Sequence, residues 1–389
     1  MLVLAVFGSL AVLSLALNLW QWRAGSRFPL HQRTSRTSQA QPVSLLKPLN
    51  GLDENTELCL RSWFCQDYSA PVQILFAVGS GDDPVCSVVR KLIAEFPKSD
   101  AQLVICQPTA GANAKVAKLV ELERLAAHEI LVVSDADVRV EPDFLVQLTA
   151  QLAQPKTGLV NCFYQMANPS TMAMRWEAVA INSDFWSQVL QSQNLKPLDF
   201  ALGAVMATRR QQLARMGGFQ AVVNCLADDY QIGNRIARLG FDIVLCPLVV
   251  ECWSDPMTWS KVWKHQLRWA RTIRVCQPIP YFFSILNNST LWPLLLVIVE
   301  PSVFAVSFGL LCLMVRTLTA ALLQARFTRK SATVCLSGFP VLKDLLQVGI
   351  WALAFAGNHV EWRGVRMRLL RDGTLVPPKE SQPRDAAST

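Results

Sequence analysis

The sequence predicts an α/β domain built on a mostly parallel sheet, with transmembrane helices at both ends of the chain. Three observations favour this fold class. Of the 389 residues, 51% are hydrophobic and only 17% are charged, which is less than the quarter usual for soluble proteins. The most apolar runs lie near the two ends of the chain. Between them, short apolar runs alternate with helix-length segments, as in parallel sheets whose strands are joined by helices.

The overall composition excludes several classes of protein. A mean hydropathy of +0.26 excludes a disordered chain, which has few apolar residues and many charges. The net charge is +8, but the basic residues lie beside apolar runs. This placement favours a membrane surface, and we expect no nucleic-acid partner. The 11 cysteines show neither CxxC pairs nor zinc spacing, so we expect reduced, buried thiols in a cytosol-facing domain.

The N-terminal segment, residues 1–22, is predicted to be a transmembrane anchor. It carries no charge before Arg23, and about 20 apolar residues suffice to span a bilayer as a helix. A cleavable signal peptide is the alternative, but its basic residues would precede the apolar run. Here they follow it, in the juxtamembrane linker 23–42 (Arg23, Arg27, Arg33 and Arg36). The positive-inside rule therefore predicts that the following part of the chain is cytoplasmic.

A second apolar region lies in residues 277–325. The run 291–315 contains Glu300 as its only charge, and its length permits one long span or two crossings with a turn at 300–302. We favour the hairpin, because it returns the basic cluster Arg326, Arg329 and Lys330 to the cytoplasmic side. The apolar stretch 345–357 is too short to span and is predicted to be interfacial or re-entrant. Residues 326–389 are expected to form a basic interfacial segment and tail on the anionic leaflet.

The middle of the chain, residues 43–276, supplies the α/β domain. Ligands of open α/β sheets bind beyond the carboxyl ends of the strands, so those ends are the places to search. Neither a GxGxxG fingerprint nor a GxxxxGK[ST] loop occurs, which argues against a dinucleotide site and a P-loop. The expected strands are 43–49, 72–78, 101–106 and 129–135, and the expected helices are 55–68, 84–96, 114–127 and 142–153.

Two pairs of aspartates are candidates for chemistry. Asp135 and Asp137 follow an apolar strand directly, and two carboxylates so placed can bind one hard cation, Mg²⁺ or Mn²⁺, together with a diphosphate. The alternative is a solvated turn. Asp228 and Asp229 precede a predicted helix. One of them could cap that helix, while the other could act as a general base with a raised pKa.

Other candidates lie on the predicted helix around residue 265 and near two strand ends. Arg268 beside Trp269 could clamp a departing phosphate, with His265 on the same helix face. Membrane anchoring by tryptophan is the alternative. Asp53 could bind a nucleotide or cap the following helix. Lys115, after a glycine-containing loop, could meet a phosphate or lie on a solvated helix face.

The combination of four motifs resembles the membrane-bound glycosyltransferases related to ceramide glucosyltransferase. The motifs are KPLNGLD, SDADVRV, GGF…LADDY and HQLRWART. The resemblance covers residues 43–274 and, weakly, Trp362-Arg363-Gly364. It implies a catalytic domain of the GT-A type in residues 43–276. It also implies that a divalent cation supports the inverting transfer of a hexose from a UDP-sugar to a lipid hydroxyl group.

The resemblance also implies roles for single residues. Asp53 matches the first aspartate of the pattern, which helps to hold the nucleotide. Asp135 matches the second, and Asp137 completes the metal-binding D-x-D motif. Asp229 matches the third aspartate, the proposed base. Arg268 and Trp269 match the final RW of the (Q/R)xxRW signature.

At the leading position of that signature the chain has His265 instead of Gln or Arg. In this it is similar to the bacterial hopanoid-associated glycosyltransferases, and so is the GANAKV segment that contains Lys115. We therefore predict a ceramide glucosyltransferase-like enzyme acting on ceramide, with UDP-N-acetylglucosamine transfer to a hopanoid as the alternative. A catalytically inactive nucleotide-sugar-binding protein is a second alternative. A polysaccharide synthase would need more membrane segments. We expect the bacterial inner membrane, or the Golgi membrane for a eukaryotic chain.

Overall fold

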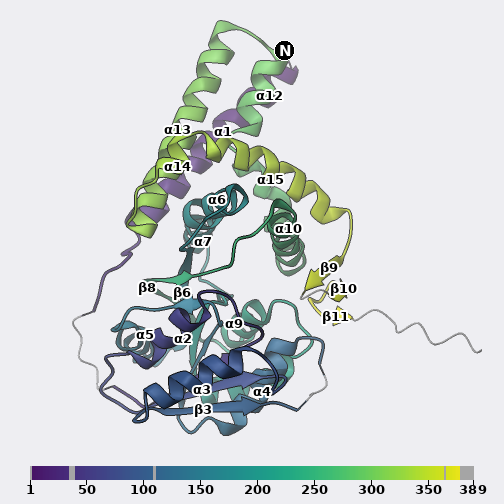
Figure 1. Cartoon of the computed structure of the whole chain (residues 1–389). Helices are drawn as coiled ribbons and strands as arrows, with labels where there is room; N and C mark the ends of the chain where they lie inside the picture. Colours follow the sequence, from purple (N-terminus) through teal and green to yellow (C-terminus); the bar gives the residue numbers. More distant parts are fainter. Residues whose placement is uncertain (1, 35–39, 108–110, 363–364, 377–389) are drawn as a thin grey trace, which may run out of the picture.

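A single eight-stranded sheet forms the centre of the catalytic part of the molecule. The computed structural model describes residues 2–34, 40–107, 111–362 and 365–376 (Figure 1). The strand order is β3-β2-β1-β4-β7-β6-β8-β5. The bounds are β1 Val43–Pro48, β2 Val72–Val78, β3 Asp100–Ile105, β4 Ile130–Ser134, β5 Val138–Arg139, β6 Thr157–Met166, β7 Val205–Arg209 and β8 Asp242–Cys252.

The sheet is parallel in its first half and mixed in its second. Strands β3, β2, β1 and β4 pair in parallel, as do β6 and β8, whereas β7 runs antiparallel to both β4 and β6. Strands β1 and β4 are fully buried, which explains their continuous apolar sequences, since helices cover both faces of such strands. The helices around the sheet are α2 Thr56–Phe64, α3 Val85–Glu95, α4 Ala114–Leu125, α5 Phe144–Leu152, α8 Arg210–Arg215, η2 Phe219–Val222 and α9 Asp228–Arg238. The predicted α/β class with a mostly parallel sheet is confirmed.

The membrane helices project together from one end of the molecule (Figure 1). Two helices, at Val3–Arg27 within α1 (Leu2–Arg27) and at Val303–Thr328 (α13), are long and apolar enough to cross a membrane. A third candidate is a pair bent by 54°, Pro278–Asn287 and Leu291–Val299, which comprises α11 (Pro278–Phe283), η3 (Ser284–Asn287) and α12 (Leu291–Val299). The predicted turn at 300–302 separates α12 from α13.

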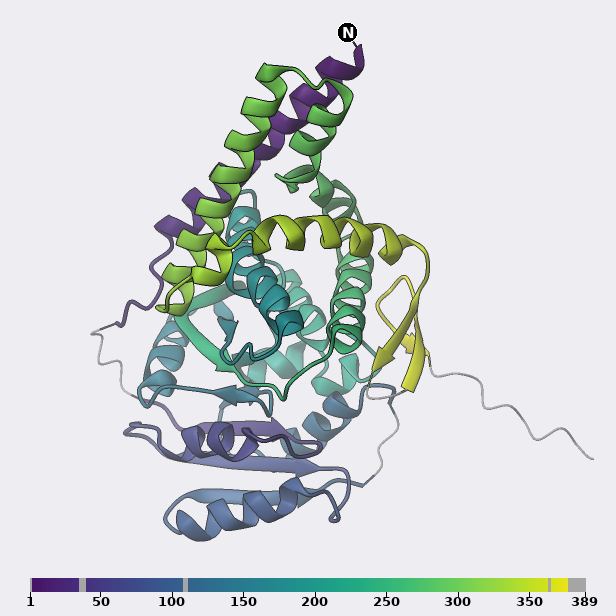
Figure 2. The same ribbon diagram turned by 45° about the horizontal axis from the view of Figure 1, so that its top comes forward.

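A layer of helices lies between the membrane helices and the sheet, and Figure 2 shows α15 crossing this layer. It comprises α6 Met172–Val179, η1 Ala180–Phe185, α7 Trp186–Gln193, α10 Trp259–Cys276, α14 Thr333–Leu336 and α15 Phe339–Phe355. The π-helix η1 interrupts the long helix from α6 to α7, and such π-helical turns are frequent at functional sites. Its Asn182 side chain binds the backbone of Met166 in both directions, at 2.9 and 3.1 Å. The sheet is thereby joined to this layer at the end of β6.

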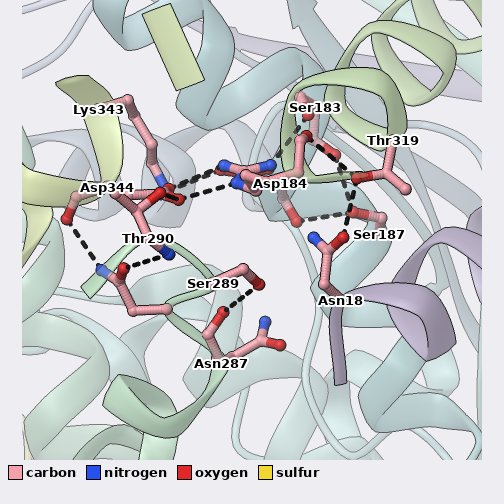
Figure 3. Close-up of polar contacts among 12 residues, drawn as sticks. Asn18, Ser183, Asp184, Ser187, Asn287, Ser289, Thr290, Thr319, Lys343 and Asp344 are labelled. Carbon is pink, nitrogen blue, oxygen red and sulfur yellow. Dashed lines mark hydrogen bonds and ion pairs between the residues drawn. The ribbon is translucent and has the colours of Figure 1, made fainter. Parts of the chain in front are cut away.

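Four charged side chains form a buried cluster where the membrane helices meet this layer (Figure 3). Arg316 of α13 donates 2.8 Å hydrogen bonds to Asp184 of η1 and to Asp344 of α15. Lys343 lies 2.7 Å from Asp184. All four side chains are at most 8% exposed. The cluster has two acids and two bases, so its charge is balanced.

The C-terminal part folds back onto the catalytic domain. Strands β9 (His359–Trp362), β10 (Val365–Leu369) and β11 (Leu375–Val376) form a small antiparallel sheet. Around β11, Leu226 N donates to Gly373 O and Leu375 N donates to Asn224 O. This sheet, absent from our sequence-based expectations, supports the loop that leads to Asp228 and Asp229. Arg36, most of the WRG segment and the tail after 376 lie outside the described residues.

Candidate active site

Acidic side chains gather at the carboxyl end of β4. Asp135 and Asp137 follow this strand directly, and the Asp135 amide donates to Ala204 O at 3.1 Å, just before β7. The low-dielectric surroundings and the charge of Asp135 raise the pKa of Asp137 to about 6. Two carboxylates this close resist ionising together. The two carboxylates therefore form a site where a bound positive charge would be favourable.

Lys115 connects the two predicted aspartate pairs. Its ammonium lies 2.6 Å from Asp135 Oδ1 and 3.4 Å from Asp228 Oδ2, and its side chain is only 13% exposed. Burial opposes its charge, but Asp135 and Asp228 raise the pKa of Lys115 above its usual value. The N-cap of α4, Asn113, accepts hydrogen bonds from Lys115 N and Val116 N and fixes the start of that helix. Lys115 is thus a buried cation at the centre of the acidic group.

Asp229 lies in the first turn of α9. Burial and the charge of Asp228 raise the pKa of Asp229 to about 7, although the positive charge of Lys115 opposes this rise. One carboxylate oxygen accepts a 2.7 Å hydrogen bond from Tyr230 N. A β-carbon at Gly203 would lie 2.8 Å from the other oxygen, so only glycine leaves room for it. A carboxylate with a pKa near neutrality is suited to accept a proton.

Lys47, on β1, holds the loop of the D-x-D motif in place through hydrogen bonds. It is fully buried and donates to Ser134 Oγ at 3.0 Å and to Asp135 O at 2.7 Å. Its ammonium lies 4.9 Å from the centre of the Trp63 ring. Burial lowers the pKa of Lys47 to about 8. The sequence analysis did not single out this residue, although it belongs to the KPLNGLD motif.

Asp53 lies after β1 in a different arrangement from the other aspartates. Its backbone N–H donates to Thr56 Oγ1 at 2.9 Å, and α2 begins at Thr56 with Asn55 as N-cap. Partial burial and the neighbouring Asp255 raise the pKa of Asp53. The positive charge of Lys261 opposes this rise. Asp255 was not predicted from the sequence.

The three predicted residues of the HQLRW segment lie on α10. His265 and Trp269 are one helical turn apart, with ring centres 4.7 Å apart. Trp269 also contacts Phe185 of η1 at 5.9 Å and Tyr164 of β6 at 6.3 Å. Arg268 is half-buried on the same helix. The structure thus joins His265 and Trp269 in one aromatic wall.

The wall and the acidic group share a neighbour. Burial, followed by the charges of groups that include Asp229, Asp135 and Glu177, raises the pKa of Tyr164 well above its usual value. Tyr164 therefore stays protonated and can donate a hydrogen bond. Its ring contacts both Trp269 and Phe185 of the aromatic wall. Tyr164 and Glu177 were both missed by the sequence analysis, because their roles depend on contacts between distant segments.

The donor set suits a divalent cation that is shared with a substrate. Among the described residues, no group of three or more His, Cys, Asp or Glu side chains is placed to hold a metal ion. The site offers Asp135 and Asp137, and burial together with the charge of Asp135 raises the pKa of Asp137, an effect that a bound dication would oppose. Mg²⁺ and similar ions are commonly held by one or two carboxylates, with phosphate oxygens and water completing the shell. The residues present therefore fit such an ion.

Comparisons with known proteins show what the chain as a whole is similar to. The chain is 22% identical over 363 residues to ceramide glucosyltransferase 3 of Caenorhabditis elegans, covering 91% of this chain and 78% of that protein. It is 35% identical over 107 residues to the ceramide glucosyltransferase of Candida albicans, covering 25% of this chain and 20% of that protein. These relatives give the hopanoid alternative no specific support.

A solved structure shares the fold. The mannosyltransferase PcManGT from Pyrobaculum calidifontis, in complex with GDP-Man and Mn²⁺, superposes with a TM-score of 0.50 at 19% sequence identity. The match covers 89% of this chain and 99% of that chain. At this identity the likeness shows the fold alone, a glycosyltransferase fold of the GT-A type. The sequence profile of glycosyl transferase family 21 matches residues 3–375. The chain is therefore a glycosyltransferase and belongs to glycosyl transferase family 21.

Proposed function

We propose that the protein is an inverting glycosyltransferase that moves a hexose from a UDP-sugar to a hydroxyl group of a membrane lipid, with ceramide as the preferred acceptor. The observation that carries this proposal is the position of Asp229. Its pKa of about 7 suits a general base, and Lys115 links its neighbour Asp228 to Asp135 of the D-x-D motif. A base beside a diphosphate site is what such a transfer requires.

The donor would bind at the end of β4. Asp135 and Asp137 would hold Mn²⁺ or Mg²⁺, which when bound neutralises the negative charge of the diphosphate. Lys115, with its pKa raised by the two aspartates, remains positively charged and attracts the same phosphates. Lys47 fixes the backbone at Asp135, so the D-x-D carboxylates keep their direction. Asp53, beside Asp255, would contact the nucleoside part of the donor.

Transfer then needs one base. Asp229 accepts the proton of the acceptor hydroxyl as its oxygen forms a bond to the anomeric carbon. The bond between that carbon and the diphosphate oxygen breaks, and UDP leaves with the electron pair. Attack from the side opposite the leaving group inverts the anomeric centre. Arg268, with His265 and Trp269 on the same helix, would stabilise the leaving diphosphate or the acceptor end.

The membrane helices would bring the acceptor to this base. Basic residues lie at the end of α1 and just after it, and Arg326, Arg329 and Lys330 lie at the end of α13 and just after it. By the positive-inside rule this pattern supports a cytoplasmic catalytic domain. Helices α15 and α11 carry exposed apolar side chains, among them Leu345, Phe282 and Phe283. These side chains would lie in the cytoplasmic leaflet of the bilayer, on the side of the catalytic domain. A lipid hydroxyl could then enter without leaving the bilayer.

A transfer assay tests the proposal. Detergent-purified protein is incubated with Mn²⁺ or Mg²⁺, a set of UDP-hexoses, and ceramide, diacylglycerol or a bacteriohopane polyol, and lipid products are identified by mass spectrometry. We expect a hexosylceramide. A glycosylated hopanoid would favour the second candidate, for which His265 at the leading motif position is the specific observation. Absence of both lipid product and UDP release would indicate an inactive binding protein and contradict the proposal.

A further inference from the structure

A buried carboxylate beside His265 has no role in the transfer described so far. Glu177, on α6, is 0% exposed. Its Oε1 lies 2.6 Å from His265 Nδ1 and accepts a 2.9 Å hydrogen bond from Gln266 Nε2. Its Oε2 has no hydrogen-bond partner among the described residues. Burying a carboxylate with one oxygen unsatisfied is costly. Packing alone therefore does not explain why a glutamate stands at this position.

The contact with Glu177 determines how His265 can interact with a ligand. A carboxylate accepts hydrogen bonds, so the short contact favours the His265 tautomer in which Nδ1–H donates a hydrogen bond to Oε1. The other ring nitrogen, Nε2, is then the one left to interact with a ligand. The His265 side chain is 27% exposed. The pair thus presents one ring nitrogen in a fixed orientation.

The pair lies in the helix layer next to α15. Helices α6 and α10, which carry Glu177 and His265, pack against α15 in one apolar cluster. The His265 ring lies 4.7 Å from the Trp269 ring, and the Trp269 ring lies 6.3 Å from that of Tyr164, on strand β6 of the central sheet. The pair is therefore joined to the apolar helix layer and, through two ring contacts, to the sheet that positions the D-x-D motif.

We propose that Glu177 and His265 form a binding site for a second, non-reacting hydroxyl group of the lipid acceptor, which makes the enzyme selective for lipids with at least two hydroxyl groups. The inference rests on the proposed function, because it needs a lipid acceptor at Asp229. The hydroxyl forms a hydrogen bond with His265 Nε2, and Glu177 holds the ring in place through the contact with Nδ1. A lipid with a single hydroxyl, such as diacylglycerol, leaves Nε2 unpaired and is a poorer substrate.

Paired acceptors test this selectivity. A short-chain ceramide is compared with its 3-deoxy analogue, and a bacteriohopane polyol with a hopanoid that has one hydroxyl group. For the wild-type protein we expect kcat/KM to be about 10- to 100-fold higher for the member with the additional hydroxyl, the range for a hydrogen bond to a charge-coupled group. A wild-type ratio near one would overturn the inference without any variant.

Variants locate the selectivity at the pair. His265→Phe removes the hydrogen-bond acceptor but keeps a ring against Trp269, and we expect the ratio to fall to near one through loss of activity on the diol. Glu177→Gln keeps the shape but not the charge that fixes the tautomer, and it should lower the ratio in the same direction. His359→Phe, at an exposed position on β9, is the matched control and should retain the wild-type ratio.

The outcomes separate this inference from the proposed function. Retention of the wild-type ratio in folded His265→Phe protein that still binds UDP would refute the assignment. A change confined to KM for the UDP-sugar would show instead that His265 binds a hydroxyl group of the donor, and would also refute it. Failure of the wild-type protein to transfer sugar to any lipid would refute the proposed function, and the inference would fall with it.

Discussion

Two buried groups of charged residues differ in charge balance. One has equal numbers of acids and bases, and the other has an excess of acids. In the cluster between the membrane helices and the helix layer, two acids face two bases, and each acid contacts both basic side chains. At the end of β4, Asp135, Asp137, Asp228 and Asp229 gather around Lys115, with Lys47 below the loop. There two carboxylates have their pKa raised, to about 6 and about 7. A balanced cluster joins elements, whereas an unbalanced one is suited to bind a cation and to accept a proton.

The largest effect is expected at the proposed base. Asp229→Asn keeps the side-chain shape but cannot accept a proton, so transfer should fall about 10²- to 10⁴-fold, the usual contribution of a general base. UDP binding should survive, because Asp229 is not among the proposed donor ligands. Product formation and UDP titration on the same preparation measure both. Near-normal turnover would show that Asp229 is not the base.

The balanced cluster should be sensitive to loss of one partner. Arg316→Met leaves Asp184 and Asp344 with Lys343 alone, and breaking a buried ion pair by removing one side costs about 3–5 kcal/mol. We expect a large loss of thermal stability in detergent without a selective change in catalysis. The double variant Arg316→Met, Asp344→Asn is the control, because Lys343 then remains paired with Asp184 alone and the restored charge balance should recover part of the stability. No difference between the two variants would contradict a charge-balance role.

Lys115 should influence donor binding and the pH profile together. Its ammonium opposes the rise in the pKa of Asp229, so Lys115→Met should shift the acid limb of kcat/KM to higher pH. Donor affinity should fall about tenfold, as expected for a lost phosphate contact of roughly 1.4 kcal/mol. Lys118→Met on the same helix is the comparison. Its Nζ donates to Leu49 O instead. An unchanged acid limb in Lys115→Met would separate Lys115 from the base.

The smallest effect is expected on the free energy of unfolding as a function of pH. The pKa of Asp229 is raised in the folded state, so folding favours its protonated form, and this stability is lost as pH rises from about 4 through about 7. Activity has the opposite dependence and should rise towards pH 7, because the base must be ionised. At pH 8, Asp229→Asn should therefore have a free energy of unfolding about 1 kcal/mol larger than that of the wild type. Its melting temperature at that pH should be correspondingly higher. Equal melting temperatures at pH 8 would contradict the raised pKa.

The sequence indicated the aspartates of the candidate site but not the residues that surround His265. The strands 72–78 and 129–135 are apolar runs with clear ends, and parallel strands bring the residues after them to one edge of the sheet. Asp135 could therefore be found from the local pattern, and Asp229, in the first turn of α9, from the motif resemblance. Glu177 could not, since its meaning depends on a contact with His265, 88 residues later. Arg316 lies in a stretch that is otherwise apolar, and its partners come from two other segments.

The C-terminal sheet shows the same limit. Its basic sequence indicated a surface segment, yet β11 meets the loop before Asp228 through backbone hydrogen bonds. Backbone pairing between distant segments leaves little trace in side-chain composition. The antiparallel direction of β7 could not be predicted from the sequence either. The order and direction of strands in a sheet follow from long-range topology and not from local periodicity.

UDP titration of the wild-type protein and of Asp135→Asn/Asp137→Asn, each with and without Mn²⁺, tests most directly whether the unbalanced cluster is the donor site. We predict that Mn²⁺ strengthens UDP binding to the wild type, and that the double variant loses this dependence while Arg316 and its partners keep the fold intact. Mn²⁺-dependent UDP binding of wild-type strength in the double variant would contradict the assignment of the cation and the diphosphate to the end of β4.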